Sequence, residues 1–391
     1  MRYKPFLSHK REQATSVAYL KQQLCIRGAG GWKDTDDLPK GGQFNGDLVA
    51  AIEHETGGFL LWATRDILTS RIICQTELPT ALDRGLRDPT YAVLPVFVDL
   101  RPSDRTAIEA QLGPVYTERL LDRNGLVRAR RQSLKALARE AAREYVRRLV
   151  GGLPDRPVDV AISAFRAPTE QHDLTLDWRS LFDEPTRTLA PDAAETIVEA
   201  LDDIREAMQA RGRNPALHVE LTLPMPLAML VGYRWRETTQ LQVTLKTVNP
   251  GTGDMLIVAP AAPTAMAWPA PRTASFPDRS GPYVLAVSVG HTLGATVDRY
   301  ADEQDARGFE HLHIDRDPRT EPLNAEEVRS LAALVARRLH ALQSQGTPKH
   351  LPLRTPASLA AAIGLAANAI GPTWVPFYDG HDYYADGLSI G

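Results

Sequence analysis

The chain has 391 residues, 43% of them hydrophobic and 24% charged, and its formal net charge is -3 at pH 7. This length exceeds what one hydrophobic core usually organises, so we expect two or three domains. The near balance of charge excludes a generic nucleic-acid coat protein, although a small nucleotide ligand needs only a local pocket.

The cysteine content and the N-terminus bear on the compartment. Cys25 and Cys74 are the only cysteines, too few for a disulfide framework or a cysteine-based zinc site. The first ten residues lack the apolar core of a signal peptide, and no apolar run approaches membrane-spanning length. A cytoplasmic protein is therefore expected.

The first third of the chain alternates short apolar runs with amphipathic ones. Strands are predicted at 3–8, 29–33, 59–63 and 91–98, and helices at 13–27, 44–55 and 70–86. This alternation predicts a parallel, doubly wound α/β sheet. Ligands bind such sheets outside the carboxyl ends of the strands, where Ser8, the loop at 34–42 and the segment at 64–70 fall.

The predicted helix at 70–86 begins SRIICQTELPTA and carries one glutamate, Glu77. Ile72, Ile73 and Leu78 are predicted to form its apolar face, with Cys74 one turn before Glu77. Most helical glutamates are solvated surface charges. This stretch alone leaves open whether Glu77 is such a charge or a placed catalytic group.

Four ordered signatures extend this interpretation. They are FLSH after the first strand, WKDTDDLPKGG after the second, LLWAT as the third, and S-x-x-x-C-x-x-E-L in the next helix. Together they resemble a TIR domain over roughly residues 1–150, with a flavodoxin-like parallel sheet. In TIR domains that cleave NAD, the glutamate of the last signature is catalytic, which implies Glu77 here. One departure is Ile73, where an aromatic residue is common.

The chemistry fits a single carboxylate. Breaking the nicotinamide–ribose bond passes through an oxocarbenium-like state that a carboxylate stabilises. Nicotinamide leaves as a neutral base, so no second carboxyl is needed. NAD+ is then the substrate and no cofactor is expected; no metal is expected either, because His9 and His54 lack partners at ligand spacing. The candidate NAD-binding residues are Ser8, His9, Lys10, Trp32, Asp37, Lys40 and Cys74.

Several of these assignments have an equal alternative. Trp32 and Trp62 could stack on the nicotinamide or adenine, but core packing is at least as good an interpretation of Trp62. His9, Lys10 and Lys40 could meet phosphates or be exposed loop charges. A helix with a solvated arginine face is predicted at 133–150, and GGLPDRP at 151–157 is predicted to link a domain at 1–150 to one at 158–391.

The last two thirds contain a repeat. HVELTLPMPLAMLVG at 218–232 aligns with HLPLRTPASLAAAIG at 350–364, at an offset of 350 − 218 = 132. The same offset relates two capping-box-like helix starts, Asp192 with Glu195 and Asn324 with Glu327. Duplication explains this register. Strands at 158–163 and 283–289 complete two Rossmann-like halves, at about 158–250 and 280–391.

Two such halves create one composite crevice at their strand ends. Helices starting near Pro226 and Ala357 would direct backbone N–H groups into it, a natural site for phosphates. The region from 157 to 391 resembles a SAVED domain, a fusion of two CARF-like units that senses cyclic oligonucleotides. That resemblance rests on DLTLDWRSLF at 173, the two proline turns and WVPFYD at 374. It implies a cyclic oligonucleotide ligand, a trinucleotide in particular.

The candidate cyclic-nucleotide contacts are Leu223, Pro224, Met225, Ser288, Gly290, His291, Thr292, Arg354, Thr355, Pro356, Trp374 and Tyr378. Turn shaping is an equal interpretation of the two prolines, as is an exposed turn for Arg354 with Thr355. Core packing competes evenly with base stacking for the two aromatic residues. His218 and His350, which start strands, are better interpreted as structural.

A TIR domain followed by a SAVED domain resembles an effector of cyclic-oligonucleotide-based antiphage signalling (CBASS). The implied cycle is ligand binding, head-to-tail assembly into a filament, and hydrolysis of NAD+ to nicotinamide and ADP-ribose. Two alternatives remain open. The TIR domain could be a non-catalytic adaptor or scaffold, or it could be a cyclase that makes a cyclic ADP-ribose variant.

Overall fold

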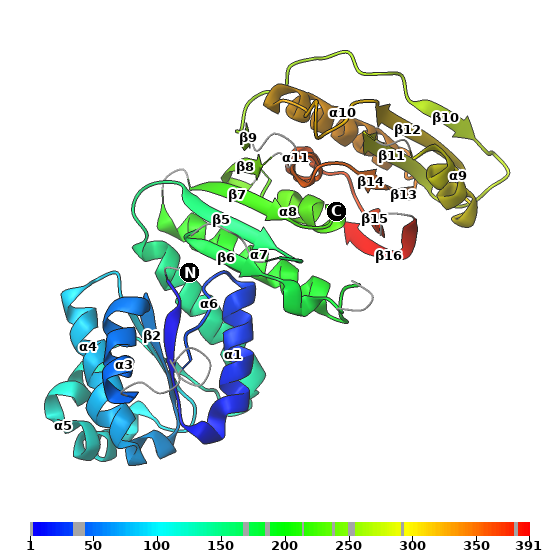
Figure 1. The fold of residues 1–391 in the computed structure, drawn as a ribbon. Coiled ribbons are helices and arrows are strands. Elements are labelled where there is room, and N and C mark those ends of the chain that lie inside the picture. The colour runs from blue at the N-terminus through cyan, green and yellow to red at the C-terminus, as the bar shows by residue number, and fades with distance from the viewer. Residues whose placement is uncertain are drawn as a thin grey trace. The chain divides into compact units, whose positions relative to one another are not determined.

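The computed structural model describes residues 3–33, 44–166, 172–183, 188–212, 215–236, 239–248, 255–290, 293–378 and 382–391. Its strands form sheets of four, five and seven strands (Figure 1). The chain divides into two compact units. The first is Met1–Val160 with Pro168–Ser180 and Glu206–Arg211, and the second is Ala161–Ala167, Leu181–Arg205 and Gly212–Gly391.

The four-stranded sheet belongs to the first unit. Its strands, in spatial order, are β1 (Pro5–Ser8), β2 (Gly58–Ala63), β3 (Ala92–Phe97) and β4 (Leu126–Val127), and all neighbours are parallel. The helices are α1 (Ala14–Ile26), α3 (Phe44–Ala50), α4 (Leu78–Arg87), α5 (Arg105–Leu121) and α6 (Leu134–Gly152), with π-helical turns at Ala51–Glu55 and Ile73–Glu77. Single 3-10 turns lie at Arg11–Gln13, Arg65–Thr69 and Pro102–Asp104. The predicted parallel α/β arrangement is confirmed.

The strand predicted at 29–33 does not form over its predicted length. Only one parallel bridge, between Phe6 and Trp32, forms there. Gly28 and Gly30 both have positive φ, 92° and 68°, which interrupts an extended backbone. Counting the bridge as a strand gives the order 2-1-3-4-5, which is the flavodoxin-like order.

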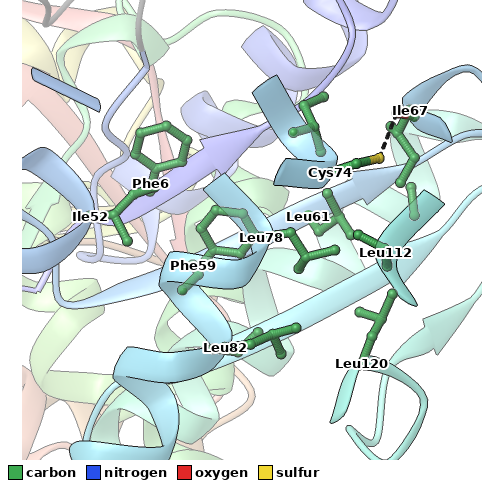
Figure 2. Packing of buried hydrophobic residues seen from close by; sticks show 14 of the residues in the cluster. Phe6, Ile52, Phe59, Leu61, Ile67, Cys74, Leu78, Leu82, Leu112 and Leu120 are labelled. Atoms are coloured by element: carbon green, nitrogen blue, oxygen red, sulfur yellow. Dashed lines mark hydrogen bonds between the residues drawn. The ribbon is translucent and has the colours of Figure 1, made fainter. Parts of the chain in front are cut away.

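The core of the first unit explains why its helices cover the sheet. Figure 2 shows Phe59 and Leu61 of β2 packed against Leu78 and Leu82 of α4, with Leu112 of α5 beside them. These side chains recur at helical spacing on α4 and alternate along β2, as amphipathic elements require. Helix α6 continues through Gly152, so the first two residues of the predicted linker are helical.

The remaining strands form two similar sheets. The first half has the sheet order β6-β5-β7-β8-β9; the second has β10-β12-β11-β13-β15-β16, with β14 also paired to β11. The elements of the first half are β5 (Val158–Ser163), β6 (Leu174–Asp177), a 3-10 turn (Arg179–Leu181), α7 (Ala193–Arg211), β7 (Ala216–Thr222), α8 (Met225–Arg234), β8 (Gln242–Val248) and β9 (Met255–Val258). Those of the second half are β10 (Arg272–Ser275), β11 (Tyr283–Val289), α9 (Gly294–Glu303), β12 (Gly308–Ile314), α10 (Ala325–Ser344), β13 (Lys349–His350), β14 (Leu353–Arg354), α11 (Ala357–Ala366), β15 (Thr373–Tyr378) and β16 (Tyr383–Ile390).

The structure confirms the repeat. Helices α7 and α10 start 325 − 193 = 132 residues apart, and α8 and α11 start 357 − 225 = 132 apart. Each half ends in an antiparallel pair, β8 with β9 and β15 with β16. The predicted capping box of Asn324 and Glu327 is also present.

Helices α8 and α11 cross at two equivalent glycines. A Cβ atom on Gly232 of α8 would overlap the carbonyl oxygen of Ala361, and one on Gly364 of α11 would overlap that of Met229. Gly364 lies 132 residues after Gly232, and Ala361 lies 132 after Met229. Because each contact is the image of the other, the two halves meet about a local two-fold axis, as identical subunits do in a symmetric dimer.

Candidate functional site

A buried carboxylate lies at the carboxyl edge of the first sheet. Ser8 is the last residue of β1, and its hydroxyl donates a 2.6 Å hydrogen bond to Oε2 of Glu77. Glu77 ends the π-helical turn and is 7% exposed. The two residues are 69 positions apart in sequence, and they meet at the edge where parallel α/β sheets bind ligands.

The π-helical turn fixes the direction of this helix. It adds one residue to a turn, so the residues before it change face relative to those after it. Ile73 and Leu78 are buried as predicted, but Ile72 is 36% exposed and does not belong to the apolar face. A hydrogen bond from Cys74 Sγ to the carbonyl oxygen of Ile67, 3.3 Å long, anchors the turn (Figure 2).

The chemistry of Cys74 follows from this position. Burial, and next the nearby Glu77 carboxylate, raise the pKa of the Cys74 thiol to about 11, against the opposing effect of Lys10. The thiol therefore stays protonated near neutral pH and is not a nucleophile. It packs beside Glu77, as the sequence predicts.

The other predicted NAD contacts are distributed unevenly. His9 and Lys10 are half-buried next to Ser8, and His9 Nδ1 lies 3.0 Å from the carbonyl oxygen of Leu7. Trp32 instead lies in the core, 1% exposed and stacked on Phe6 with ring centroids 4.6 Å apart, so it offers no face to a ligand. Trp62 is fully buried, which confirms its core interpretation. Asp37 and Lys40 lie outside the described residues.

A polar row crosses the carboxyl ends of the second-half strands. Ser288 of β11 pairs with His313 of β12 on one side and with Arg354 of β14 on the other. The Arg354 guanidinium lies 5.2 Å from the ring centroid of Tyr378 on β15. The structure thus brings Ser288, Arg354 and Tyr378 together, as the repeat predicts.

Much of this row is occupied by internal contacts. Ser288 is fully buried, and its hydroxyl lies 2.9 Å from His311 Nε2 and 2.9 Å from His313 Nδ1. Burial, and next the neighbouring His313, lower the pKa of His311 to about 4, so this imidazole is neutral near pH 7. Thr355 is also buried. Among the described residues of this row, Arg354, Tyr378 and His313 are half-buried.

The two proline turns start helices as predicted. Pro224 and Pro356 are the N-cap residues of α8 and α11, and Met225 is the first residue of α8; Leu223, just before the first turn, is buried. Gly290 has φ 89°, and a Cβ there would lie 2.7 Å from Pro318, so this turn requires glycine. His291 and Thr292 fall beyond the part of the chain that the structure describes.

Two aromatic neighbours of this row have structural partners. The imidazole Nδ1 of His350 lies 2.8 Å from the hydroxyl of Tyr300, which confirms its structural interpretation. Trp374 is half-buried with its ring centroid 6.4 Å from that of His350. His350 and Trp374 pair with each other near the start of β15. Neither residue is therefore in register with Ser288.

A pocket that the sequence analysis missed lies elsewhere in the second unit. It has a volume of about 750 Å³ and is lined by the start of β8, the segment after β9, and helices α10 and α11. Arg236, Arg329, Arg337 and His340 contribute the basic groups, and none of its described lining residues is Asp or Glu. Its walls are aliphatic, with Ala332, Ala333, Ala336, Ala362 and Leu365 prominent.

Comparing the two copies of the repeat would have revealed this pocket. At the 132-residue offset, Arg329, Ala333 and Ala336 of α10 correspond to Ile197, Leu201 and Ile204 of α7. The three α7 residues are fully buried. Large aliphatic residues in one copy therefore become arginine and alanine in the other, at the positions that line the pocket.

These observations define a mixed α/β protein with parallel sheets and an internal duplication within residues 158–391. No helix among the described residues is long and apolar enough to cross a membrane. Within the same residues, no group of three or more His, Cys, Asp and Glu side chains could hold a metal ion.

No family model and no curated protein matches the sequence. Among solved structures, the chain is similar to an Acinetobacter baumannii Cap4 SAVED/CARF-domain containing receptor with the cyclic trinucleotide 3'3'3'-cAAA, at a TM-score of 0.48 and 12% identity over 87% of this chain and 84% of that chain. It is also similar to a Moraxella osloensis Cap4 SAVED/CARF-domain containing receptor, at a TM-score of 0.45 and 11% identity over 100% of this chain and 87% of that chain. Both TM-scores are below 0.5.

Proposed function

We propose that this chain is a cyclic-oligonucleotide-activated NAD+ glycohydrolase. The first unit would cleave NAD+ to nicotinamide and ADP-ribose, and the second unit would bind the activator, as in the CBASS effectors that the sequence resembles. The observation that supports the reaction most strongly is the buried Glu77 carboxylate held by Ser8 at the carboxyl edge of a parallel sheet.

The reaction needs little more than a placed carboxylate. The bond between ribose C1′ and the nicotinamide nitrogen breaks, and its electron pair neutralises the pyridinium. Positive charge then develops at C1′, where the Glu77 carboxylate would stabilise it. Water adds to C1′ and releases one proton. The Ser8 hydroxyl, which donates to Oε2 at 2.6 Å, would hold the carboxylate in place while it stabilises this charge.

Self-association would complete the site. Glu77 is 7% exposed, so NAD+ reaches it only if neighbouring segments move. A second copy packed against this edge would hold those segments open and cover the substrate. Activator binding to the second unit would promote this head-to-tail contact, which extends into a filament unless it closes.

An NAD+ consumption assay tests the proposal. Purified full-length protein is incubated with NAD+ and a panel of cyclic di- and trinucleotides, and chromatography separates nicotinamide, ADP-ribose and cyclised products. We expect one cyclic trinucleotide to trigger release of nicotinamide with ADP-ribose. Glu77→Gln should reduce the rate by about 100-fold or more, whereas Glu109→Gln, an exposed helical glutamate of the same unit, should not.

Two outcomes oppose the proposal. NAD+ that stays intact across the whole panel would indicate a binding scaffold. A Glu77→Gln protein as active as wild type would remove Glu77 from the mechanism. A cyclic ADP-ribose product would change the reaction to cyclisation while leaving the site in place.

A further inference from the structure

We propose that the pocket between α10, α11 and the start of β8 binds the cyclic oligonucleotide, with Arg329 and Arg337 as its phosphate ligands. The identity of the ligand rests on the proposed function. The location rests on the charge, the space and the duplicated sequence of the pocket itself.

Two arginines of α10 line this pocket. Arg329 and Arg337 lie 337 − 329 = 8 residues apart, about 12 Å along the helix axis. Neither has an ion pair within the described ranges, and Arg329 Nη1 donates a 3.3 Å hydrogen bond to the carbonyl oxygen of Ala259. The Nε–H of Arg329 is buried without a hydrogen-bond partner there. A buried donor of a charged group is costly unless it is paired, so an anionic ligand would stabilise it.

The two halves of the duplicated region differ at the positions that line the pocket. In α7 the equivalent positions hold Ile197, Leu201 and Ile204, all fully buried. Helix α10 instead buries Val328, Leu331 and Val335, where α7 has Thr196, Glu199 and Asp203. Arg329, Ala333 and Ala336 of α10 line a pocket of about 750 Å³. That is a normal size for a small-molecule site.

The arrangement favours a ligand with more than one phosphate. Guanidinium groups bind phosphate oxygens through paired hydrogen bonds, and two arginines about 12 Å apart along the helix can each bind a separate phosphate. Guanidinium planes also stack on bases. The aliphatic walls would cover sugar and base faces. A cyclic oligonucleotide combines these features.

The polar row at Ser288 fits this ligand less well. Its serine hydroxyl already contacts two imidazoles, and Thr355 beside it is buried. The pocket also has lining from both halves, with Leu241 and Val243 from the first and α10 with α11 from the second. Ligand binding there would hold one half against the other, which gives the activator a direct effect on the second unit.

The experiment measures binding of cyclic tri-adenylate and the other panel members to full-length protein by isothermal titration calorimetry. For the ligand that wild type binds, we expect Arg329→Gln and Arg337→Gln each to raise Kd by about 10-fold or more. Ala333→Leu, which restores the residue of the first copy, should block binding sterically. Arg319→Gln, an exposed arginine outside the pocket, is the matched control and should bind normally. Thermal unfolding checks that each variant is folded.

Three other outcomes would contradict the proposed binding site. Equal affinity in wild type and all three pocket variants overturns it while leaving the proposed function in place. Loss of binding in Arg354→Gln, with binding kept in the pocket variants, would move the ligand to the polar row. Absence of binding to every panel member would overturn the inference together with the activator half of the proposed function, and the NAD+ assay would then show whether cleavage survives alone.

Discussion

Helices α7 and α10 occupy equivalent positions in the two halves of the duplicated region, yet they contact their surroundings differently. Helix α7 buries Ile197, Leu201 and Ile204, whereas α10 places an arginine and two alanines there, at a pocket. The crossing of α8 and α11, by contrast, keeps the same glycine in both copies. The two copies thus have the same residue where they contact each other and different residues at the pocket. The shared glycine is required by the fold, and the residues that differ are the ones we assign to a ligand.

The largest effect is expected when α10 is given the residues of α7 at the pocket. Arg329→Ile, Ala333→Leu and Ala336→Ile together give α10 the residues of α7. We expect binding of the activating oligonucleotide to fall below detection in calorimetry, because both the charge and the space are removed. The unfolding midpoint should not fall, because these positions line the pocket and the buried residues Val328, Leu331 and Val335 of α10 are unchanged. Binding at wild-type affinity would show that the divergence has no role in recognition.

The reverse change should damage the first copy. Leu201→Ala removes a fully buried side chain and should cost about 2–5 kcal/mol of unfolding free energy in urea. Ile257→Ala, at a residue that is 51% exposed, is the matched control and should cost about 0.5 kcal/mol or less. If both variants cost the same, the α7 face is not packed as the structure shows.

The shared crossing gives a smaller and symmetric effect. Gly232→Ala and Gly364→Ala should each destabilise the second unit by about 1–3 kcal/mol, because the added methyl group meets a backbone carbonyl. Gly151→Ala, in helix α6 with open space around its Cβ position, should instead stabilise by up to about 1 kcal/mol. Urea unfolding of the three variants compares them. A clear inequality between the two crossing glycines would contradict the local two-fold axis.

The smallest effect concerns pH. Because burial lowers the pKa of His311 from its usual 6.5 to about 4, the unfolded chain binds a proton on this imidazole at a higher pH than the folded chain does. Stability from this residue is therefore complete above pH 6.5 and is lost progressively as pH falls toward 4. His311→Gln should flatten the fall in unfolding free energy between these values, and His54→Gln, at an exposed histidine, should not. An unchanged slope in His311→Gln would contradict the buried, neutral imidazole.

The sequence predicted the regular parts of this fold well. Strands β5 and β11 have the predicted bounds, and α8 and α11 begin after the predicted prolines, because periodicity and proline turns are local signals. The strand at 29–33 failed because two glycines with positive φ intervene. Ile72 was misplaced because a π-helical turn changes the helix face without a sequence signature.

The sites were predicted only in part. The sequence predicts Ser8 at the sheet edge and Glu77 as the catalytic candidate of the next helix. Their hydrogen bond joins residues 69 apart and depends on the exact packing of helix and strand. Trp32 is aromatic and was therefore a candidate for stacking on the ligand, but its ring packs in the core against Phe6. The pocket at Arg329 depends on how α10 faces β8 of the other half, and that tertiary relation lies beyond any local pattern.

The most direct test of the central claim is nicotinamide release measured against protein concentration, with and without a saturating cyclic oligonucleotide. The account predicts negligible release without the ligand. With ligand, the rate per chain should rise as protein concentration rises, because Glu77 becomes accessible only when copies assemble. Release at the same rate with and without ligand, or a rate per chain that does not depend on protein concentration, would contradict it.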